Sequence, residues 1–173
     1  MVNTRGRDQV APGRLESVRT LLNTWLIPND TRVPEDRFDA YAESEHVPAA
    51  ERTQLRQLRD DLRSVVDRTA TSDEVLNRWM DRLGMRPEIV SGKLSFRHAA
   101  GVSGETVVTC LAAVLSGEWG RLKACPDCRW VFYDHSRNGS KRWCLMTAGG
   151  PGGRSCGSIA KVRAYRARAR RRA

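Results

Sequence analysis

Hydrophobic residues recur at helical spacing through much of the first 120 residues. Between residues 14 and 26 the apolar positions are three or four apart, which predicts an amphipathic helix that ends before Pro28. A short helix is expected around residues 37–43. A longer helix follows Pro48, with its leucines on one face, and the Arg and Asp residues of the opposite face are interpreted as solvated.

Two further helices and a hairpin are predicted between residues 71 and 119. Thr71 and Glu74 have the spacing of a capping box, so a helix should begin here. Ile89 and Val90 before Ser91-Gly92, and the alternation of Leu94, Phe96 and His98 after it, then predict a small β-hairpin. The next helix, roughly residues 104–119, is apolar on most positions and should be buried. The pattern favours a mainly helical domain with a small β component.

The net charge is unevenly distributed along the chain. The 173 residues contain 30 Lys and Arg against 20 Asp and Glu, a formal charge of +10. Residues 1–120 carry 16 basic and 18 acidic side chains, a net of −2, whereas residues 121–173 carry 14 basic and 2 acidic ones, a net of +12. We therefore predict a helical domain of residues 1–120 and a basic module of residues 121–173 that provides the partner surface.

Four of the five cysteines lie in the basic module. Cys125 and Cys128 form a CxxC motif, and Cys144 and Cys156 follow it. A CxxC turn supplies two thiolates, and a tetrahedral zinc ion needs two more ligands from a distant segment. No βαβ pattern surrounds the motif, which argues against a redox pair. The four cysteines are predicted to bind one structural zinc ion, with no open coordination position for catalysis.

The fourth zinc ligand has two candidates in the sequence. A glycine-rich run, residues 147–155, separates Cys144 from Cys156, and such a loop can bring Cys156 back to the metal at little entropic cost. His135 competes for the same position. We favour Cys156.

The residues around the CxxC motif resemble a known family. The resemblance lies in the run from Cys125 to Met146, with Trp130, Phe132, Asp134, Ser136 to Gly139 and Lys141 to Cys144, and in a Cys-Gly pair followed by Ala160 to Arg163. This pattern is similar to the CGNR zinc-finger family of bacteria. Residues 11–16 and 23–24 resemble the start of the ABATE domain that accompanies it. The resemblance implies a stress-related transcription regulator with a treble-clef or ribbon-like zinc module.

The sequence departs from the family motif after the last cysteine. It has Ser158 and Ile159 where the motif has Asn and Arg. Ser158 is expected to cap a following helix instead. From Ile159 the chain is rich in Ala and Arg, so we predict a basic helix that packs on the zinc module through Ile159, Val162 and Tyr165. A frayed, solvated C-terminal tail is the alternative.

Residues of the basic module are candidates for nucleic-acid contact, because Arg and Asn pair with base edges and Lys and Arg with phosphates. They are Arg137, Asn138, Lys141 and Arg142 on the turn between zinc-bearing strands, and Lys161, Arg163, Arg166 and Arg170 on the helix. An equally good interpretation is that Asp134 pairs with Arg137 or ties the turn together. Trp130, Phe132 and Trp143 are interpreted as a mini-core rather than base-stacking platforms.

No pattern in the sequence predicts an enzyme. The three histidines are scattered along the chain, and no phosphate-binding loop or nucleophile motif is found. His98 is expected to be a packed side chain, and Cys110 is expected to be a thiol of the hydrophobic core. The first residues lack the apolar run of a secretory signal and no stretch is long enough for a membrane span, which favours the reducing cytoplasm.

Three functions fit these observations. The first is a zinc-dependent transcription regulator that binds double-stranded DNA and whose N-terminal domain senses a small-molecule effector or forms a homodimer. The second is an RNA-binding or ribosome-associated zinc-ribbon protein. The third is an adaptor that binds an acidic protein partner, with the zinc ion purely structural. Charge alone does not separate them.

Overall fold

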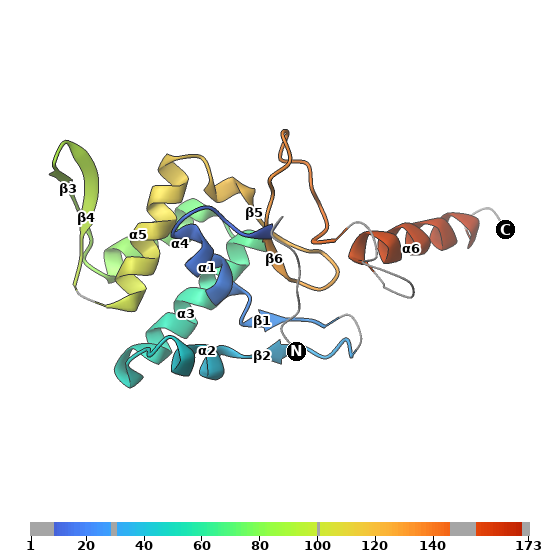
Figure 1. Ribbon diagram of the computed structural model, residues 1–173, viewed down its shortest axis with the longest axis horizontal. Helices are drawn as coiled ribbons and strands as arrows, with labels where there is room; N and C mark the ends of the chain where they lie inside the picture. The colour runs from blue at the N-terminus through green and yellow to red at the C-terminus, as the bar shows by residue number, and fades with distance from the viewer. Residues whose placement is uncertain (1–8, 29–30, 100, 146–154, 171–173) are drawn as a thin grey trace.

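The computed structural model describes residues 9–28, 31–99, 101–145 and 155–170 (Figure 1). It confirms the predicted class, mainly helical with small sheets and a four-cysteine module that ends in a helix. The helices of the first part are α1 (Leu15–Leu22), α2 (Phe38–Ser44), α3 (Ala49–Val66), α4 (Ser72–Arg82) and α5 (Val102–Leu115). The described strands pair antiparallel as β1 (Trp25–Leu26) with β2 (Glu35–Asp36), β3 (Arg86–Val90) with β4 (Lys93–Arg97), and β5 (Leu122–Ala124) with β6 (Val131–Tyr133). A short 3-10 helix (Trp119–Arg121) precedes β5, and α6 (Cys156–Arg170) extends away from the body (Figure 1).

Capping and turn residues explain where several elements begin. The Thr71 Oγ accepts a hydrogen bond from the Glu74 N–H, and the Glu74 carboxylate accepts one from the Thr71 N–H, so the predicted capping box is confirmed. Ser91 and Gly92 join β3 to β4 and both have positive φ, 50° and 74°. Two-residue hairpin loops favour this left-handed conformation because its twist matches that of the strands.

Helix α1 is shorter than the sequence predicts. It ends at Leu22, because the chain turns at Asn23 and Thr24, whose side chains bond to backbone carbonyls. Trp25 and Leu26 then pair with β2 instead of continuing the helix. The interpretation of residues 14–26 as one helix is therefore wrong in its last four positions.

Two arginines of α3 are buried, which corrects the prediction of a fully solvated charged face. Arg59 is 2% exposed and forms two bonds to the carboxylate of Asp36, at 2.6 and 2.9 Å. Arg63 is 4% exposed and donates to the carbonyl of Leu22 at 2.6 Å. Burial lowers the pKa of Arg63 to about 10, so it is still a cation at neutral pH. These arginines connect α3 to the chain segment around β1 and β2.

One hydrophobic core extends from the helical body into the zinc module. Helices α1, α3, α4 and α5 surround it, and Leu122, Val131 and Tyr133 of the last strand pair belong to the same cluster. Cys110 of α5 is fully buried there, and burial raises the pKa of its thiol, as expected for a core thiol. His98 packs against α5 at Gly104, where a Cβ atom would overlap its ring, which confirms a packed histidine.

No helix in the described ranges combines the length and the apolar character needed to cross a lipid bilayer.

Candidate metal centre and basic surface

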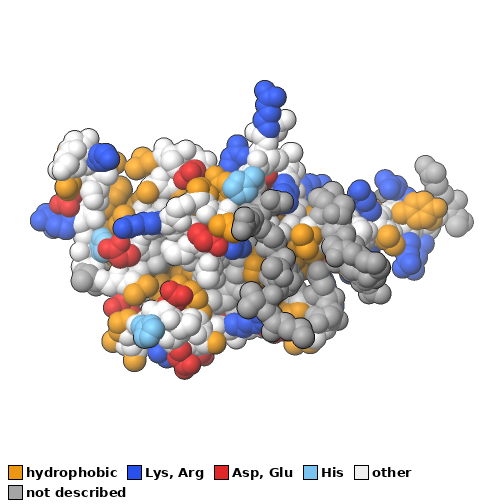
Figure 2. Space-filling model, in the orientation of Figure 1, with side chains coloured by type: hydrophobic (Ala, Val, Ile, Leu, Met, Phe, Trp, Pro, Cys, Tyr) orange, Lys and Arg blue, Asp and Glu red, His pale blue; other side chains and the backbone are white. Residues whose placement is uncertain are grey.

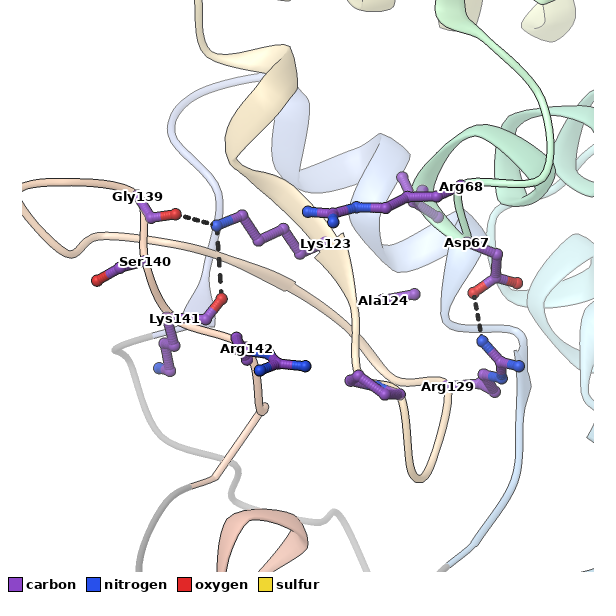
Figure 3. A pocket seen from close by; sticks show the side chains of 11 residues that line it. Asp67, Arg68, Lys123, Ala124, Arg129, Gly139, Ser140, Lys141 and Arg142 are labelled. Carbon is purple, nitrogen blue, oxygen red and sulfur yellow. Dashed lines mark hydrogen bonds and ion pairs between the residues drawn. The ribbon is translucent and has the colours of Figure 1, made fainter. Parts of the chain in front are cut away.

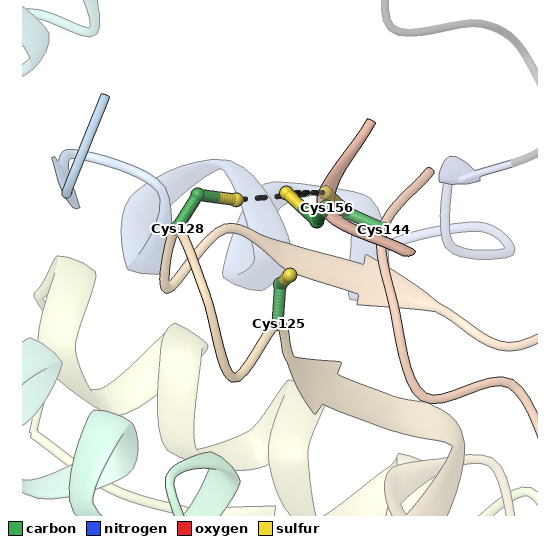
Figure 4. Close-up of side chains that lie close together, drawn as sticks. All are labelled: Cys125, Cys128, Cys144 and Cys156. Carbon is green, nitrogen blue, oxygen red and sulfur yellow. Dashed lines mark hydrogen bonds between the residues drawn. The ribbon is translucent and has the colours of Figure 1, made fainter. Parts of the chain in front are cut away.

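The four cysteines of the basic module meet at one point (Figure 4). The Sγ atoms of Cys125, Cys128, Cys144 and Cys156 lie within 4.8 Å of one another, and all four residues are buried. The Cys144 Sγ lies 3.5 Å from that of Cys128 and 3.6 Å from that of Cys156. Zn–S bonds of about 2.3 Å in a tetrahedron place sulfur atoms about 3.8 Å apart. The cluster therefore has the size of a single structural zinc site.

Local backbone structure positions the cysteines. Cys125 and Cys128 lie on the turn between β5 and β6, where the Cys125 N–H donates to the carbonyl of Trp130 at 2.8 Å. Cys156 is the first residue of α6. Free N–H groups at a helix N-terminus favour a thiolate, so this placement supports metal binding. The glycine-rich run at residues 147–155, expected to return the chain to the metal, lies outside the described residues except for Ser155.

The cap of α6 involves Ser155 as well as Ser158, the residue that the sequence predicted as the cap. Ser155 is the residue before the helix, and its Oγ accepts from the Ser158 N–H at 3.1 Å. Ser158 lies in the first turn and its Oγ accepts from the Ser155 N–H at 3.3 Å. The two serines thus cap the helix reciprocally, and Ser158 contributes to the cap from inside the helix rather than preceding it.

Close packing of the thiols creates an electrostatic need for a cation. Hydrogen bonds from Cys128, Cys144 and Cys156 lower the pKa of Cys125, whereas donation to Cys125 raises the pKa of Cys144. The hydrogen bond with Cys125 and the charge of Cys125 also oppose the ionisation of Cys128, but bonds from Cys144 and Cys156 outweigh them and lower its pKa to about 7. A divalent soft cation removes this conflict, because it stabilises all four thiolates together.

His135, the competing fourth ligand, lies outside the cluster. Its Nε2 is 2.8 Å from the carbonyl oxygen of Val10, and its ring packs on Tyr133 with centroids 4.8 Å apart. The structure therefore brings together the four cysteines that the sequence favours, with Cys156 as the fourth member.

A small apolar cluster surrounds the sulfur atoms. Phe132 is fully buried against the cysteines, and the partly buried Trp130 and Trp143 pack on the same cluster. These three aromatic residues form the predicted mini-core. Their burial keeps water from the sulfur atoms, as a structural zinc site requires.

Asp134 ties the turn after β6 together. Its buried carboxylate accepts from the Lys123 Nζ at 2.6 Å, the Ser136 N–H at 2.9 Å and the Lys141 N–H at 2.8 Å. Burial raises the pKa of this carboxyl, but the bonds from Lys123, Ser136 and Lys141 outweigh it, so the net pKa is well below the usual range. The expectation that Asp134 ties the turn together is confirmed, although its partner is Lys123 and not Arg137.

Asp127 connects the CxxC turn to α6. Its carboxylate, 4% exposed, accepts from the Arg163 Nη1 at 2.9 Å and lies 3.4 Å from the Arg32 Nη1. Val162 and Tyr165, which were expected to pack on the zinc module, are 48% and 70% exposed. That expectation is wrong. The helix is anchored through Cys156 and Arg163, because a single small metal site offers little apolar surface.

The predicted nucleic-acid contacts fall into three places. Lys161, Arg166 and Arg170 are exposed along α6, and Figure 2 shows cationic side chains around this helix. Arg137 and Asn138 are exposed at the tip of the turn after β6. The remaining three have additional neighbours: Lys141 and Arg142 line a pocket beside the body, and Arg163 pairs with Asp127.

The joint between the body and the zinc module was missed at the sequence level. Asn23 pairs with Val131 as a neighbouring strand would: its Nδ2 donates to the Val131 carbonyl at 2.8 Å and its Oδ1 accepts from the Val131 N–H at 2.7 Å. Gln9 bridges the Cys144 carbonyl and the Trp130 Nε1. Arg63 donates to the carbonyl of Arg129.

One sequence signal could have shown that Arg59 and Arg63 are buried. They lie at helical spacing with Leu55 and Val66, which places both arginines on the apolar face of α3.

We expect Asn23→Ala to destabilise the protein by about 1–3 kcal/mol, because it leaves the buried N–H of Val131 without its acceptor. Urea unfolding of the zinc-loaded protein measures this. Thr20→Ala is the control, since Thr20 is exposed on α1, the helix that ends just before Asn23, and its side chain bonds to the carbonyl of Glu16 one turn earlier. Equal stability of the two variants would show that the Asn23 bonds contribute nothing.

Comparison with protein families identifies the basic module. The CGNR zinc finger family model matches residues 121–169, a segment that includes all four clustered cysteines and most of α6. Residues 1–120 lie outside this match. A comparison with curated protein sequences finds no match.

Proposed function

We propose that this zinc finger serves a cytoplasmic bacterial transcription regulator and binds double-stranded DNA through α6. The observation that carries the proposal is the composition and placement of that helix. Its 15 residues include no acidic side chain, and its Lys and Arg residues are exposed. Duplex DNA presents a dense array of phosphates, and a cationic helix that neutralises them gains free energy from counterion release.

The anchoring of α6 supports a binding role over a frayed tail. The helix begins at a zinc ligand, is capped by Ser155 and is paired to the CxxC turn through Arg163 and Asp127. A fixed helix loses less conformational entropy on binding than a disordered segment does. At 1.5 Å per residue it is about 22 Å long, enough to follow a groove over several base pairs.

The helical body completes the proposal. The resemblance of its first residues to the ABATE domain favours a part in ligand sensing or homodimer formation. The shared core and the hydrogen bonds of Gln9 and Asn23 connect it to the zinc finger, so a change in the body has a direct route to the DNA-binding surface.

We expect the triple variant Lys161→Gln, Arg166→Gln and Arg170→Gln to weaken DNA binding and to flatten its salt dependence. Each lost phosphate contact lowers the slope of log K against log salt by about 0.9. The matched control changes the same charge on the far hairpin, as Arg86→Gln, Lys93→Gln and Arg97→Gln, three residues that are also exposed. Fluorescence anisotropy with a labelled duplex at several salt concentrations measures both proteins.

Competition between duplex DNA and structured RNA at fixed salt decides the kind of nucleic acid. Strict preference for RNA would replace DNA by an RNA-binding role, and absence of both interactions would leave the acidic protein partner. A salt slope that is the same in the α6 variant and the wild type contradicts the assignment of α6 as the binding surface.

A further inference from the structure

A basic pocket lies between the end of α3 and the zinc finger (Figure 3). Its volume is about 370 Å³, within the range of small-molecule sites, which is roughly 300–1,000 Å³. Its charged lining residues are Arg68, Lys123, Arg129, Lys141, Arg142 and Asp67. Five cations and one carboxylate therefore face a single hollow. The body supplies Asp67 and Arg68, and the zinc finger supplies the other four.

The cations differ in how far they are already paired. Lys123 donates to Asp134 and to the carbonyls of Gly139 and Lys141, and Arg129 lies 3.5 Å from the carboxylate of Asp67. Arg68 and Arg142, in contrast, have no acidic partner among the described residues. Figure 3 shows the Arg68 side chain extended towards Lys123 and that of Arg142 on the opposite side of the hollow. Two arginines are thus available to an anion.

Backbone conformation does not explain the arginines at this pocket. Arg68 has φ 62° and Arg129 has φ 58°, the left-handed conformation in which glycine is preferred. Arg68 follows the C-terminus of α3 and Arg129 follows the CxxC turn, two positions where glycine would serve the fold better. Both guanidinium groups line the pocket, and planar guanidinium groups suit phosphate oxygens.

We propose that this pocket binds the terminal phosphate or pyrophosphate group of a small molecule. A terminal phosphate has three free oxygens and close to two negative charges, so it can enter a hollow and bond to several cations at once. A phosphodiester within a duplex is esterified on both sides and carries one charge. It suits protruding cations such as those of α6 better than a recessed pocket. The ligand contacts both the body and the zinc finger, so it strengthens their joint.

The test uses the full, zinc-loaded chain and inorganic pyrophosphate, titrated calorimetrically at constant ionic strength. Arg68→Gly should lower the affinity at least tenfold, and Arg68→Gly with Arg142→Gln should lower it further. Glycine fits the backbone at residue 68, so the variant is expected to fold at least as well as the wild type. Arg32→Gly is the matched control, because Arg32 also has a left-handed φ, 58°, and lies outside the pocket.

Three results would overturn the inference. They are no saturable pyrophosphate binding by the wild type, an equal loss in Arg32→Gly and Arg68→Gly, and a loss of duplex binding in Arg68→Gly with pyrophosphate affinity unchanged. The last would make the pocket part of the DNA surface. Pyrophosphate binding and DNA binding are measured in separate titrations. If the wild type does not bind DNA, the proposed function is contradicted, whereas the pocket is still tested by its affinity for pyrophosphate.

Discussion

Cys156→Ser is expected to abolish tight zinc binding and to unfold the zinc finger. The four Sγ atoms form one cluster, and removal of a thiolate leaves an incomplete coordination shell. Structural zinc contributes roughly 10–16 kcal/mol to the folding of small zinc fingers, as much as the whole stability of a typical domain, about 5–15 kcal/mol. Bound metal, measured by elemental analysis of the purified protein, should fall from one zinc ion per chain to a small fraction.

The effect of zinc loss should extend into the helical body. Leu122, Val131 and Tyr133 belong to the core that α1, α3, α4 and α5 surround, so disorder of the zinc finger exposes part of that core. Chelation of the wild-type protein should therefore lower the melting temperature of the helical signal in circular dichroism. A helical transition that is the same with and without chelator would show that the body folds independently of the metal.

Two controls make the zinc experiment specific. Cys110→Ala removes another fully buried cysteine, but Cys110 lies in α5 and outside the cluster. The Cys110→Ala protein should therefore contain as much zinc as the wild type. His135→Ala should also retain zinc, since the His135 ring contacts Val10 and Tyr133. Full zinc in Cys156→Ser together with loss of zinc in His135→Ala would contradict the four-cysteine ligand set.

Asp134→Asn is expected to destabilise the zinc-loaded protein by about 3–5 kcal/mol, the usual cost of breaking a buried ion pair from one side. The carboxylate of Asp134 is fully buried and accepts from Lys123, Ser136 and Lys141, and an amide cannot accept all these bonds. Urea unfolding in saturating zinc measures the change. Asp81→Asn, an exposed substitution with the same change of charge, should alter stability by less than about 0.5 kcal/mol.

The pH dependence of this difference has a definite sign. The pKa of Asp134 is lowered in the folded protein, whereas an unfolded Asp titrates near 3.9. The carboxylate therefore stabilises the fold fully above pH about 4, and this contribution is lost as pH falls through the lower, folded pKa. The difference between wild type and Asp134→Asn should stay constant from pH 8 to pH 5. A steady decrease over that interval would contradict the lowered pKa.

The double variant Asp134→Asn with Lys123→Met provides a further test of the pair. Removal of both charges leaves no uncompensated ion, so the double variant should be more stable than the sum of the two single effects predicts. Additive effects would show that Lys123 and Asp134 do not stabilise each other.

Local sequence signals predicted the elements that short-range rules determine. The capping box at Thr71, the hairpin at Ser91-Gly92 and the zinc-binding set from Cys125 to Cys156 follow from the residues themselves, because capping, turn formation and metal coordination require particular side chains at particular spacings. The position of the domain boundary after residue 120 stays a prediction.

Long-range contacts account for what the sequence did not predict. The bonds from Asn23 to Val131 and from Gln9 to Cys144 join residues more than one hundred positions apart, and no periodicity encodes such pairs. The burial of Arg59 depends on the carboxylate of Asp36, which β2 brings to α3. The attachment of α6 was predicted from its apolar residues, but the anchor is the ion pair of Arg163 with Asp127.

The strand-like pairing of Asn23 with Val131 has a consequence for how this chain can recombine. A recombination event after residue 120 would join this zinc finger to the N-terminal domain of another protein. The hybrid would then lack the side-chain amides of Gln9 and Asn23, which bond to the zinc finger. Such hybrids should fold poorly unless residues 9–27 and 121–145 come from the same parent. We therefore expect residues 9–27 and 121–145 to be inherited together, although their coding segments are far apart in the gene.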